Sequence, residues 1–298
     1  MIALPNFIVV GASKSGTTSL YHYLKQHPDI FLSDKQKEGR YFSKMEGNYS
    51  GPGDANVDLS IIRNLEEYKA LFSNYNGEKA IGDISPEYLY FYKNAIPQIK
   101  KDLNDEVKII IILRSPIDRA FSGYLHFKRD SRETLSFEEG LEKEKERAAK
   151  NYIWAWQYKN SGLYSEQVRA YTENFKNVKI IIFDDFKESP DDVLKEVCRF
   201  LEVDPDFKFD TSYKYNVSGK PKSQALYKLE TSRGLIHFIK KFIPAKLVRK
   251  IKNRYTGEKQ MVKPEMSSET KDKLIAFFND DILKLQEIIQ QDLSRWLM

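Results

Sequence analysis

The sequence predicts an α/β protein in which a parallel β-sheet is flanked by helices on both faces. Short apolar segments alternate along the chain with longer segments of helical periodicity, and this order is typical of strands that return through helices to parallel neighbours. The apolar segments contain few polar residues, as is typical of strands buried on both faces. Because ligands bind such sheets at the carboxyl ends of the strands, function is expected in the turns that follow the strands.

The predicted strands are runs of β-branched and other apolar residues. We expect them at 7–11, 80–83, 107–113 and 178–183. The third contains four consecutive isoleucines and the fourth contains three, and such runs favour strands.

The predicted helices have apolar residues spaced three or four apart. We expect them at 18–26, 60–73, 93–103, 117–129, 136–149, 162–175, 190–202 and 268–290. The stretch from Gly47 to Asp54 contains three glycines and a proline, which predicts a surface loop. No internal repeat or low-complexity linker divides the 298 residues. We therefore expect one domain over 1–298, with a basic and mostly helical C-terminal region from about 220 to 298.

The segment Gly11–Thr18 runs from the first predicted strand into the first predicted helix. Its two glycines, Gly11 and Gly16, allow tight turns, and its free N–H groups at a helix N-terminus can hold an anion. The glycine spacing is P-loop-like, but Thr17 follows Gly16 where a triphosphate-binding loop needs lysine. The cation of this loop is Lys14, which suits a nucleotide with one 5′-phosphate and one further transferable anionic group.

A second strand-to-helix turn follows the third predicted strand. Arg114 stands at the end of that strand and Ser122 on the helix that follows, where a guanidinium fork and a hydroxyl can hold a terminal phosphate. Taken alone, a loop of the first kind is often only a turn, and an arginine after a strand is often only a surface residue. The two together, in this order, indicate a nucleotide site.

These motifs resemble those of sulfotransferases that use 3′-phosphoadenosine 5′-phosphosulfate (PAPS), and most closely the heparan-sulfate-type and bacterial carbohydrate branch. The resemblance implies transfer of a sulfuryl group from PAPS to a hydroxyl of a carbohydrate or small hydroxylated metabolite, with 3′-phosphoadenosine 5′-phosphate (PAP) as product. It assigns the donor site to Ser13, Lys14, Ser15, Gly16, Thr17, Thr18, Arg114, Ser122, Ser218, Gly219 and Lys220.

Further segments are similar to that branch. The Lys-Glu-Gly-Arg-Tyr-Phe segment at 37–42 resembles the one in which the glutamate is the catalytic base, which implies Glu38. The Asp-Ile-Ser-Pro segment that begins at Asp83 resembles the acceptor cleft and implies Asp83 and Ser85, while Tyr164 lies in a similar Gly-x-Tyr segment. Asp83 replaces the usual glutamate and Ile84 a frequent lysine, so the acceptor is less defined than the chemistry.

In-line sulfuryl transfer needs a positioned donor, a base for the acceptor proton and a charge that stabilises the departing phosphate. We expect Lys14 to supply the charge and Glu38 to be the base, with its pKa raised by partial burial. His126 is the alternative base, although a structural or substrate-lining role is favoured for it. Trp154, in an aromatic cluster at 152–158, could stack on a sugar but is more simply core.

The histidines show no metal-ligand spacing with cysteine or carboxylates, so we expect no metal. The single cysteine, Cys198, lies in a helical pattern and cannot form an internal disulfide, which fits a reducing cytoplasm. No apolar run approaches the roughly 18 residues that span a bilayer, and the N-terminus lacks the basic region of a signal peptide. We therefore expect a cytoplasmic protein.

Basic residues are concentrated between Lys220 and Lys263, with 13 Lys or Arg against two Glu in a chain of net charge +5. Such a strip can guide an anionic acceptor, and its amphipathic part at 235–251 can touch anionic lipid. Helices that pack their apolar face on the domain explain the same pattern. Nucleic acid is not expected as a partner, because no reader motif accompanies the charge.

Two other functions stay open from the sequence. A P-loop phosphotransferase would depend on Mg²⁺ and ATP, and Thr17 and the lack of an acidic Mg²⁺ site disfavour it. A non-catalytic binder of nucleotides or polyanions would need no carboxylate base. The acceptor, the choice between O- and N-sulfation and the oligomeric state are not given by the sequence.

Overall fold

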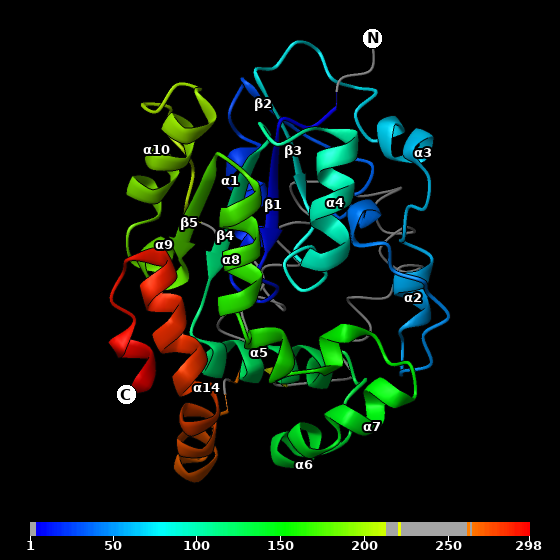
Figure 1. Ribbon diagram of the computed structural model, residues 1–298, viewed down its shortest axis with the longest axis vertical. Helices are drawn as coiled ribbons and strands as arrows, with labels where there is room; N and C mark the ends of the chain where they lie inside the picture. The colour runs from blue at the N-terminus through cyan, green and yellow to red at the C-terminus, as the bar shows by residue number, and fades with distance from the viewer. Residues whose placement is uncertain (1–3, 213–219, 222–260, 263) are drawn as a thin grey trace.

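The computed structural model describes residues 4–212 and 264–298, together with the backbone of 220–221 and 261–262. Its centre is a five-stranded, fully parallel sheet with the order β2-β3-β1-β4-β5 (Figure 1). The strands are β1 (Phe7–Gly11), β2 (Ile30–Leu32), β3 (Ala80–Ile84), β4 (Lys108–Leu113) and β5 (Val178–Ile182). A separate two-stranded antiparallel ribbon pairs β6 (Lys220–Pro221) with β7 (Met261–Val262).

Helices connect and cover the strands. They are α1 (Thr17–Leu24), α2 (Ala55–Asp58), α3 (Leu65–Ala70), α4 (Tyr92–Asp102), α5 (Pro116–Arg129), α6 (Phe137–Glu142), α7 (Glu144–Ala149), α8 (Ser165–Asn174), α9 (Phe183–Glu188), α10 (Pro190–Leu201) and α14 (Ser268–Ile289). Short 3₁₀ turns lie at η1 (Tyr41–Ser43), η2 (Trp154–Trp156), η3 (Asn160–Gly162) and η5 (Ser294–Leu297).

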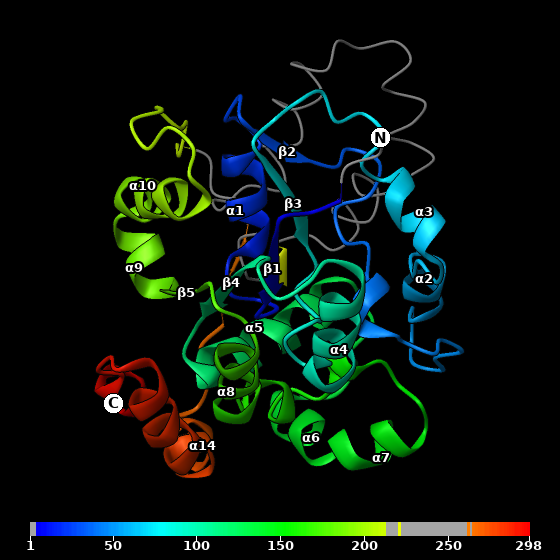
Figure 2. The same ribbon diagram turned by 45° about the horizontal axis from the view of Figure 1, so that its top comes forward.

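Each face of the sheet contributes to its own apolar core, because successive strand residues point to opposite faces. Ile8 and Val10 of β1 pack in a core with residues of α4, α5, α8 and α14. Phe7 and Val9 pack in a second core with residues of α1 and α10. Figure 2 shows α4 and α8 on one side of the sheet and α1 and α10 on the other. The predicted fold class is thus confirmed.

Several predicted elements differ from those observed. The short edge strand β2 was not expected, and α9 begins where the β5 strand was expected to end. The helix expected at 60–73 is only Leu65–Ala70, because it starts at an Asn64 cap whose side chain accepts from the Glu67 N–H. The helix expected at 136–149 is divided at Lys143 into α6 and α7.

The stretch from Gly47 to Asp54 is more than a surface loop. Asp54 is fully buried, and its carboxylate accepts hydrogen bonds from the Ile153 N–H at 2.9 Å and the Trp156 indole at 3.1 Å and pairs with Arg132. The aromatic cluster at 152–158 is accordingly part of the core on this side of the molecule.

The carboxyl ends of β1, β3 and β4 lie side by side, because β1 is hydrogen-bonded to both neighbours. The turns that start at Ala12, Ser85 and Arg114 therefore meet at one edge of the sheet. This edge is where the fold class places a ligand.

Candidate active site

The turn between β1 and α1 is a compact loop held against the sheet. The Ala12 N–H donates to the Ile112 carbonyl of β4 at 2.7 Å. Gly16 has φ of +92°, and a Cβ there would lie 2.9 Å from two carbons of the Phe183 ring. Lys14 takes a left-handed conformation with φ of 69°, which is unusual for a residue other than glycine, asparagine or aspartate. The loop thus needs glycine at 16 and holds Lys14 in a conformation that an unconstrained turn would avoid.

The ammonium group of Lys14 lies among other charges. The pKa of Lys14 is lowered to about 7, chiefly by burial, with the cations Arg129 and Arg114 adding to the shift and Asp130 and Glu38 opposing it. A lysine whose pKa is lowered this far has too little negative charge around it to offset its burial. The loop and this cation therefore fit an anionic group such as a 5′-phosphosulfate.

Arg114 is directed back to the same loop. Its Nη1 lies 3.4 Å from the Lys14 carbonyl, Nη2 lies 3.6 Å from Asp118, and the guanidinium stacks over Phe183 at 5.1 Å. Its Nε is buried and has no hydrogen-bond partner among the described residues. A buried donor without an acceptor is costly, and a phosphate oxygen would satisfy it.

Ser122 lies buried on α5, and the β6 ribbon packs against the same helix. The backbone of Lys220 is in that ribbon, so this predicted donor residue is brought to the helix that carries Ser122. Ser218 and Gly219 lie outside the described residues, as does the basic segment at 235–251.

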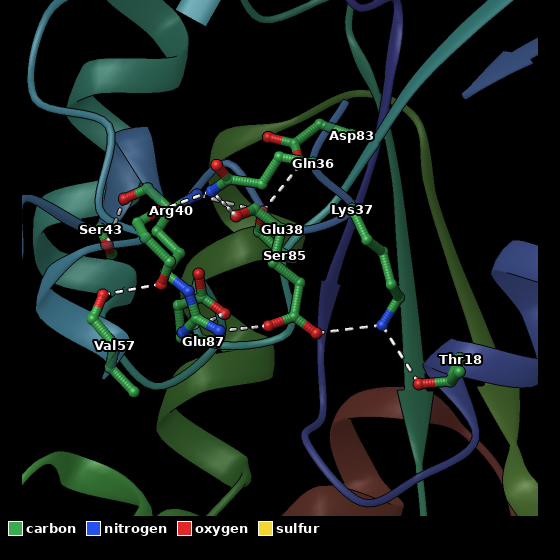
Figure 3. Close-up of polar contacts among 11 residues, drawn as sticks. Thr18, Gln36, Lys37, Glu38, Arg40, Ser43, Val57, Asp83, Ser85 and Glu87 are labelled. Atoms are coloured by element: carbon green, nitrogen blue, oxygen red, sulfur yellow. Dashed lines mark hydrogen bonds and ion pairs between the residues drawn. The ribbon is translucent and has the colours of Figure 1, made fainter. Parts of the chain in front are cut away.

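Glu38 is held between two cations (Figure 3). The Lys37 ammonium donates to Glu38 Oε1 at 3.0 Å and also to the Thr18 hydroxyl of α1 at 3.2 Å. Arg40 pairs with the other carboxylate oxygen. The Lys37 ammonium thereby bridges the Glu38 carboxylate and α1, the helix that follows the loop containing Lys14.

The pKa expected for Glu38 was wrong in direction. Burial alone raises the pKa of Glu38, but the charges of Lys37 and Arg40, the Lys37 hydrogen bond and the charge of Lys14 together bring it below its ordinary value. The sequence shows the basic residues on both sides of Glu38, but it does not show that both turn toward its carboxylate.

Arg40 also faces a second carboxylate that sequence reasoning missed. Its Nη1 lies 3.8 Å from Glu87, whose side chain is fully buried. Glu87 lies one residue after the Asp-Ile-Ser-Pro segment, and its charge was the one signal that pointed to it.

Asp83 and Ser85 form an internal hydrogen-bond network. The carboxylate of Asp83 accepts from the hydroxyls of Ser85 at 2.8 Å, Tyr68 at 2.9 Å and Tyr88 at 2.9 Å. Burial raises the pKa of Asp83 to about 6, although these hydrogen bonds lower it. The charge of Glu38 also acts on Asp83, so the network lies near the proposed base, and direct acceptor contact by Asp83 or Ser85 stays a prediction.

His126 on α5 lies close to Lys14. The charge of Lys14, followed by burial and the charges of Arg129 and Arg132, holds the pKa of His126 well below its ordinary value. Its Nδ1 lies 2.7 Å from Arg129 Nη2. Because a guanidinium only donates, Nδ1 is the acceptor and the neutral ring carries its proton on Nε2.

Trp154 and Tyr164, predicted for the acceptor, are both buried. Trp154 stacks on Tyr90 with ring centroids 5.3 Å apart. The Tyr164 N–H donates to Asp281 of α14 at 2.7 Å, and burial raises the pKa of Tyr164 to about 12. A contact of either residue with an acceptor stays a prediction.

Across residues 4–212 and 264–298, no group of three His, Cys, Asp or Glu side chains could hold a metal ion. In the same part of the chain, no helix is both long and apolar enough to cross a membrane.

Comparisons with known proteins agree on one family. A family model described as the sulfotransferase domain matches residues 4–296. The crystal structure of a sulfotransferase from Alicyclobacillus acidocaldarius is similar to this structure with a TM-score of 0.79 and 36% sequence identity, and the match covers 100% of both chains.

Two curated relatives extend the comparison. Human bifunctional heparan sulfate N-deacetylase/N-sulfotransferase 3 is 24% identical over 307 residues, which cover 99% of this chain and 31% of that protein. The membrane-associated sulfotransferase kil1 of Dictyostelium discoideum is 35% identical over 127 residues, which cover 43% of this chain and 24% of that protein. The chain thus spans about a third or less of the length of these relatives.

Proposed function

The chain belongs to the sulfotransferase family, and from this premise we propose that it transfers a sulfuryl group from PAPS to a hydroxyl of a carbohydrate or small hydroxylated metabolite. The resemblance drawn from the two turn motifs is confirmed, and the chain is a sulfotransferase enzyme. The donor, the base and the acceptor are the proposed parts. The observation that carries them is the placement of Glu38 beside the loop that contains Lys14, with Lys37 linking the carboxylate to α1.

We assign the 5′ end of the donor to the loop between β1 and α1 and its 3′-phosphate to Arg114, Ser122 and the β6 segment. The unpartnered Nε of Arg114 and the depressed pKa of Lys14 support this assignment, because each is relieved by an anion. When bound, the donor supplies the sulfuryl group and a phosphate leaving group. Lys14 is placed to neutralise the charge that grows on that leaving group.

We assign to Glu38 the role of the base that takes the acceptor's proton. Its low pKa keeps the carboxylate ionised and able to accept a proton at neutral pH. His126 fits the role less well, because its Nδ1 accepts from Arg129 and its Nε2 then carries the proton. A neutral imidazole in this state can donate a hydrogen bond to a bound oxyanion.

A carbohydrate acceptor is favoured by the similarity to the human heparan sulfate N-deacetylase/N-sulfotransferase, whose name gives heparan sulfate as its substrate. The proposal is tested by incubating the protein with radiolabelled PAPS and a panel of polysaccharides and hydroxylated metabolites. Label should appear in at least one acceptor without added Mg²⁺.

Donor choice is tested separately by calorimetry. PAP should bind far more tightly than ATP or ADP, because the loop lacks the lysine after Gly16 that triphosphates need. Equal affinity for all three nucleotides would contradict the assignment of the donor site.

A further inference from the structure

Glu87 is a fully buried carboxylate beside the proposed base. It follows β3 in the turn that also contains Ser85, and its side chain is 0% exposed. No described side chain donates a hydrogen bond to either of its oxygens. Its charged contact is with Arg40, at 3.8 Å. Burial of a carboxylate with so little compensation is costly, which points to a purpose other than stability.

Arg40 is shared between Glu87 and Glu38 (Figure 3). Its Nη2 pairs with Glu38 and its Nη1 faces Glu87. The backbone of Arg40 is left-handed, with φ of 59°, a conformation that is strained in a non-glycine residue. The strained backbone of Arg40 thus lies next to the buried Glu87 carboxylate, which has no hydrogen-bond partner among the described residues.

We propose that Glu87 is a positioning residue that sets the basicity of Glu38 through the guanidinium that the two carboxylates share. This inference rests on the proposed role of Glu38 as the base. Glu87 touches neither donor nor acceptor in this scheme.

The effect has a definite sign. When Glu38 takes the acceptor's proton it becomes neutral, and an ionised Glu87 then remains to balance Arg40 in the buried site. When Glu87 is protonated, the same proton transfer would leave Arg40 without a charged partner, so protonation of Glu38 is less favourable and its pKa is lower. Glu38 is therefore the stronger base when Glu87 is ionised.

Three other charged groups act on the pKa of Glu87: Arg40, Glu38 and Asp83. Burial raises the pKa of Glu87 to about 7; Arg40 opposes this shift, while Glu38 and Asp83 add to it. Asp83 is bound by three hydroxyls, including that of Tyr88. Arg40 thus provides the direct ionic contact, and Asp83 adds a second buried carboxyl whose own pKa is about 6.

The consequence is an acidic limb in the pH profile that belongs to Glu87. As the pH falls through about 7, Glu87 takes up a proton, Glu38 becomes a weaker base and turnover should fall. If Glu38 acted without Glu87, the acidic limb would instead lie below the ordinary pKa of a glutamate, because the pKa of Glu38 is lowered. Lys14 titrates in the opposite sense, and an anionic donor raises its pKa, so kcat at saturating donor separates the two groups.

The test is the pH dependence of kcat for wild type, Glu87→Gln and Asp83→Asn at saturating PAPS and acceptor. Wild type should show an acidic limb near neutral pH. Glu87→Gln should lose that limb and have a kcat several-fold below the wild-type plateau, because its neutral amide mimics protonated Glu87. Asp83→Asn is the matched control, a buried carboxyl of the same cluster without the Arg40 ion pair, and it should keep the limb, moved to a somewhat lower pH because the Asp83 charge helps to raise the pKa of Glu87.

A limb that persists in Glu87→Gln, or that disappears only in Asp83→Asn, would overturn the inference. If thermal unfolding shows that Glu87→Gln does not fold, the pH profile of the wild-type kcat still tests the proposal. A single acidic limb at the lowered pKa of Glu38, with none near neutral pH, would contradict it. Failure of the proposed function is distinguishable, because it appears as full activity in Glu38→Gln whatever the Glu87 variants do.

Discussion

The proposed donor site has two cations, Lys14 and Arg114, and the pKa of Lys14 is lowered to about 7, mainly by burial. The Arg114 Nε is buried without an acceptor among the described residues, and its Nη1 reaches the carbonyl of Lys14. The two side chains come from turns that are about a hundred residues apart and meet because β1 and β4 are paired. A ligand that bridges these turns is bound by both.

Arg114→Ala should weaken PAP binding by about 1.5–3 kcal/mol, the contribution of a hydrogen bond to a charged group. The loss should be much smaller for 5′-AMP, which lacks the 3′-phosphate assigned to Arg114. Calorimetry with both nucleotides measures the difference. An equal loss for the two would assign Arg114 to the 5′ end instead.

Lys14 should take up a proton when PAP binds. Its pKa is about 7 in the free protein, and an adjacent anion raises it, so at about pH 8 a mostly neutral amine becomes an ammonium ion. Calorimetric titrations in buffers of different ionisation enthalpy measure this uptake. Lys14→Arg, which stays charged at this pH, is the control and should bind without proton uptake; uptake that is unchanged in this variant would belong to another group.

At the scale of elements, the loop between β1 and α1 is shaped by its contact with α9. Gly16 faces the Phe183 ring at the start of that helix. The sequence predicts the loop from its glycines, but α9 itself was not expected, so the packing reason for Gly16 became visible only in the fold.

Gly16→Ala should lower both stability and PAP affinity. The new Cβ would lie 2.9 Å from Phe183 in a backbone with φ of +92°. Gly77→Ala is a matched control, because Gly77 has φ of +97° and nothing within 4 Å of the added Cβ. It should cost only the left-handed penalty of about 1–2 kcal/mol.

Urea unfolding and calorimetry compare the two variants. Gly16→Ala should be the less stable, and PAP affinity should fall in that variant alone. Equal losses in stability with unchanged affinity would show that the Phe183 contact does not shape the loop.

Strand prediction succeeded where the periodicity was simple. The four expected strands are present as β1, β3, β4 and β5, and runs of β-branched residues leave few alternatives in β1, β4 and β5. The three-residue β2 was missed because its pairing with β3 is a tertiary contact. The helix expected at 136–149 is divided at Lys143, within a run of charged residues at 142–147 that contains no glycine or proline to mark the break.

The structure brings the predicted segments together, while their roles in binding and catalysis stay predictions. The turns at Lys14 and Arg114 and the segment at Glu38 do meet at one edge of the sheet. The direction of the Glu38 pKa shift was wrong, and Glu87 was missed, because both depend on which way Arg40 turns. A left-handed Arg40 is a property of the folded segment that its sequence did not reveal.

For the whole molecule, the family is shown over residues 4–296, while several expectations stay predictions. They are the single domain over 1–298, the cytoplasmic location, the lack of a metal and the role of the basic strip between Lys220 and Lys263. Most of that strip lies outside the described residues.

The central claim is that Glu38 takes the acceptor's proton next to a PAPS site built on Lys14 and Arg114. Its most direct test is kcat of Glu38→Gln, measured as transfer of radiolabelled sulfate at saturating PAPS, with PAP affinity measured by calorimetry on the same preparation. Glu66→Gln, on the exposed surface of α3, is the control and should match wild type. Glu38→Gln should lose roughly 10²–10⁴-fold in kcat while its PAP affinity stays within a few-fold of wild type. Retention of more than about a tenth of wild-type kcat, far above the remainder expected without a general base, would contradict the account, most clearly if His126→Ala abolished turnover.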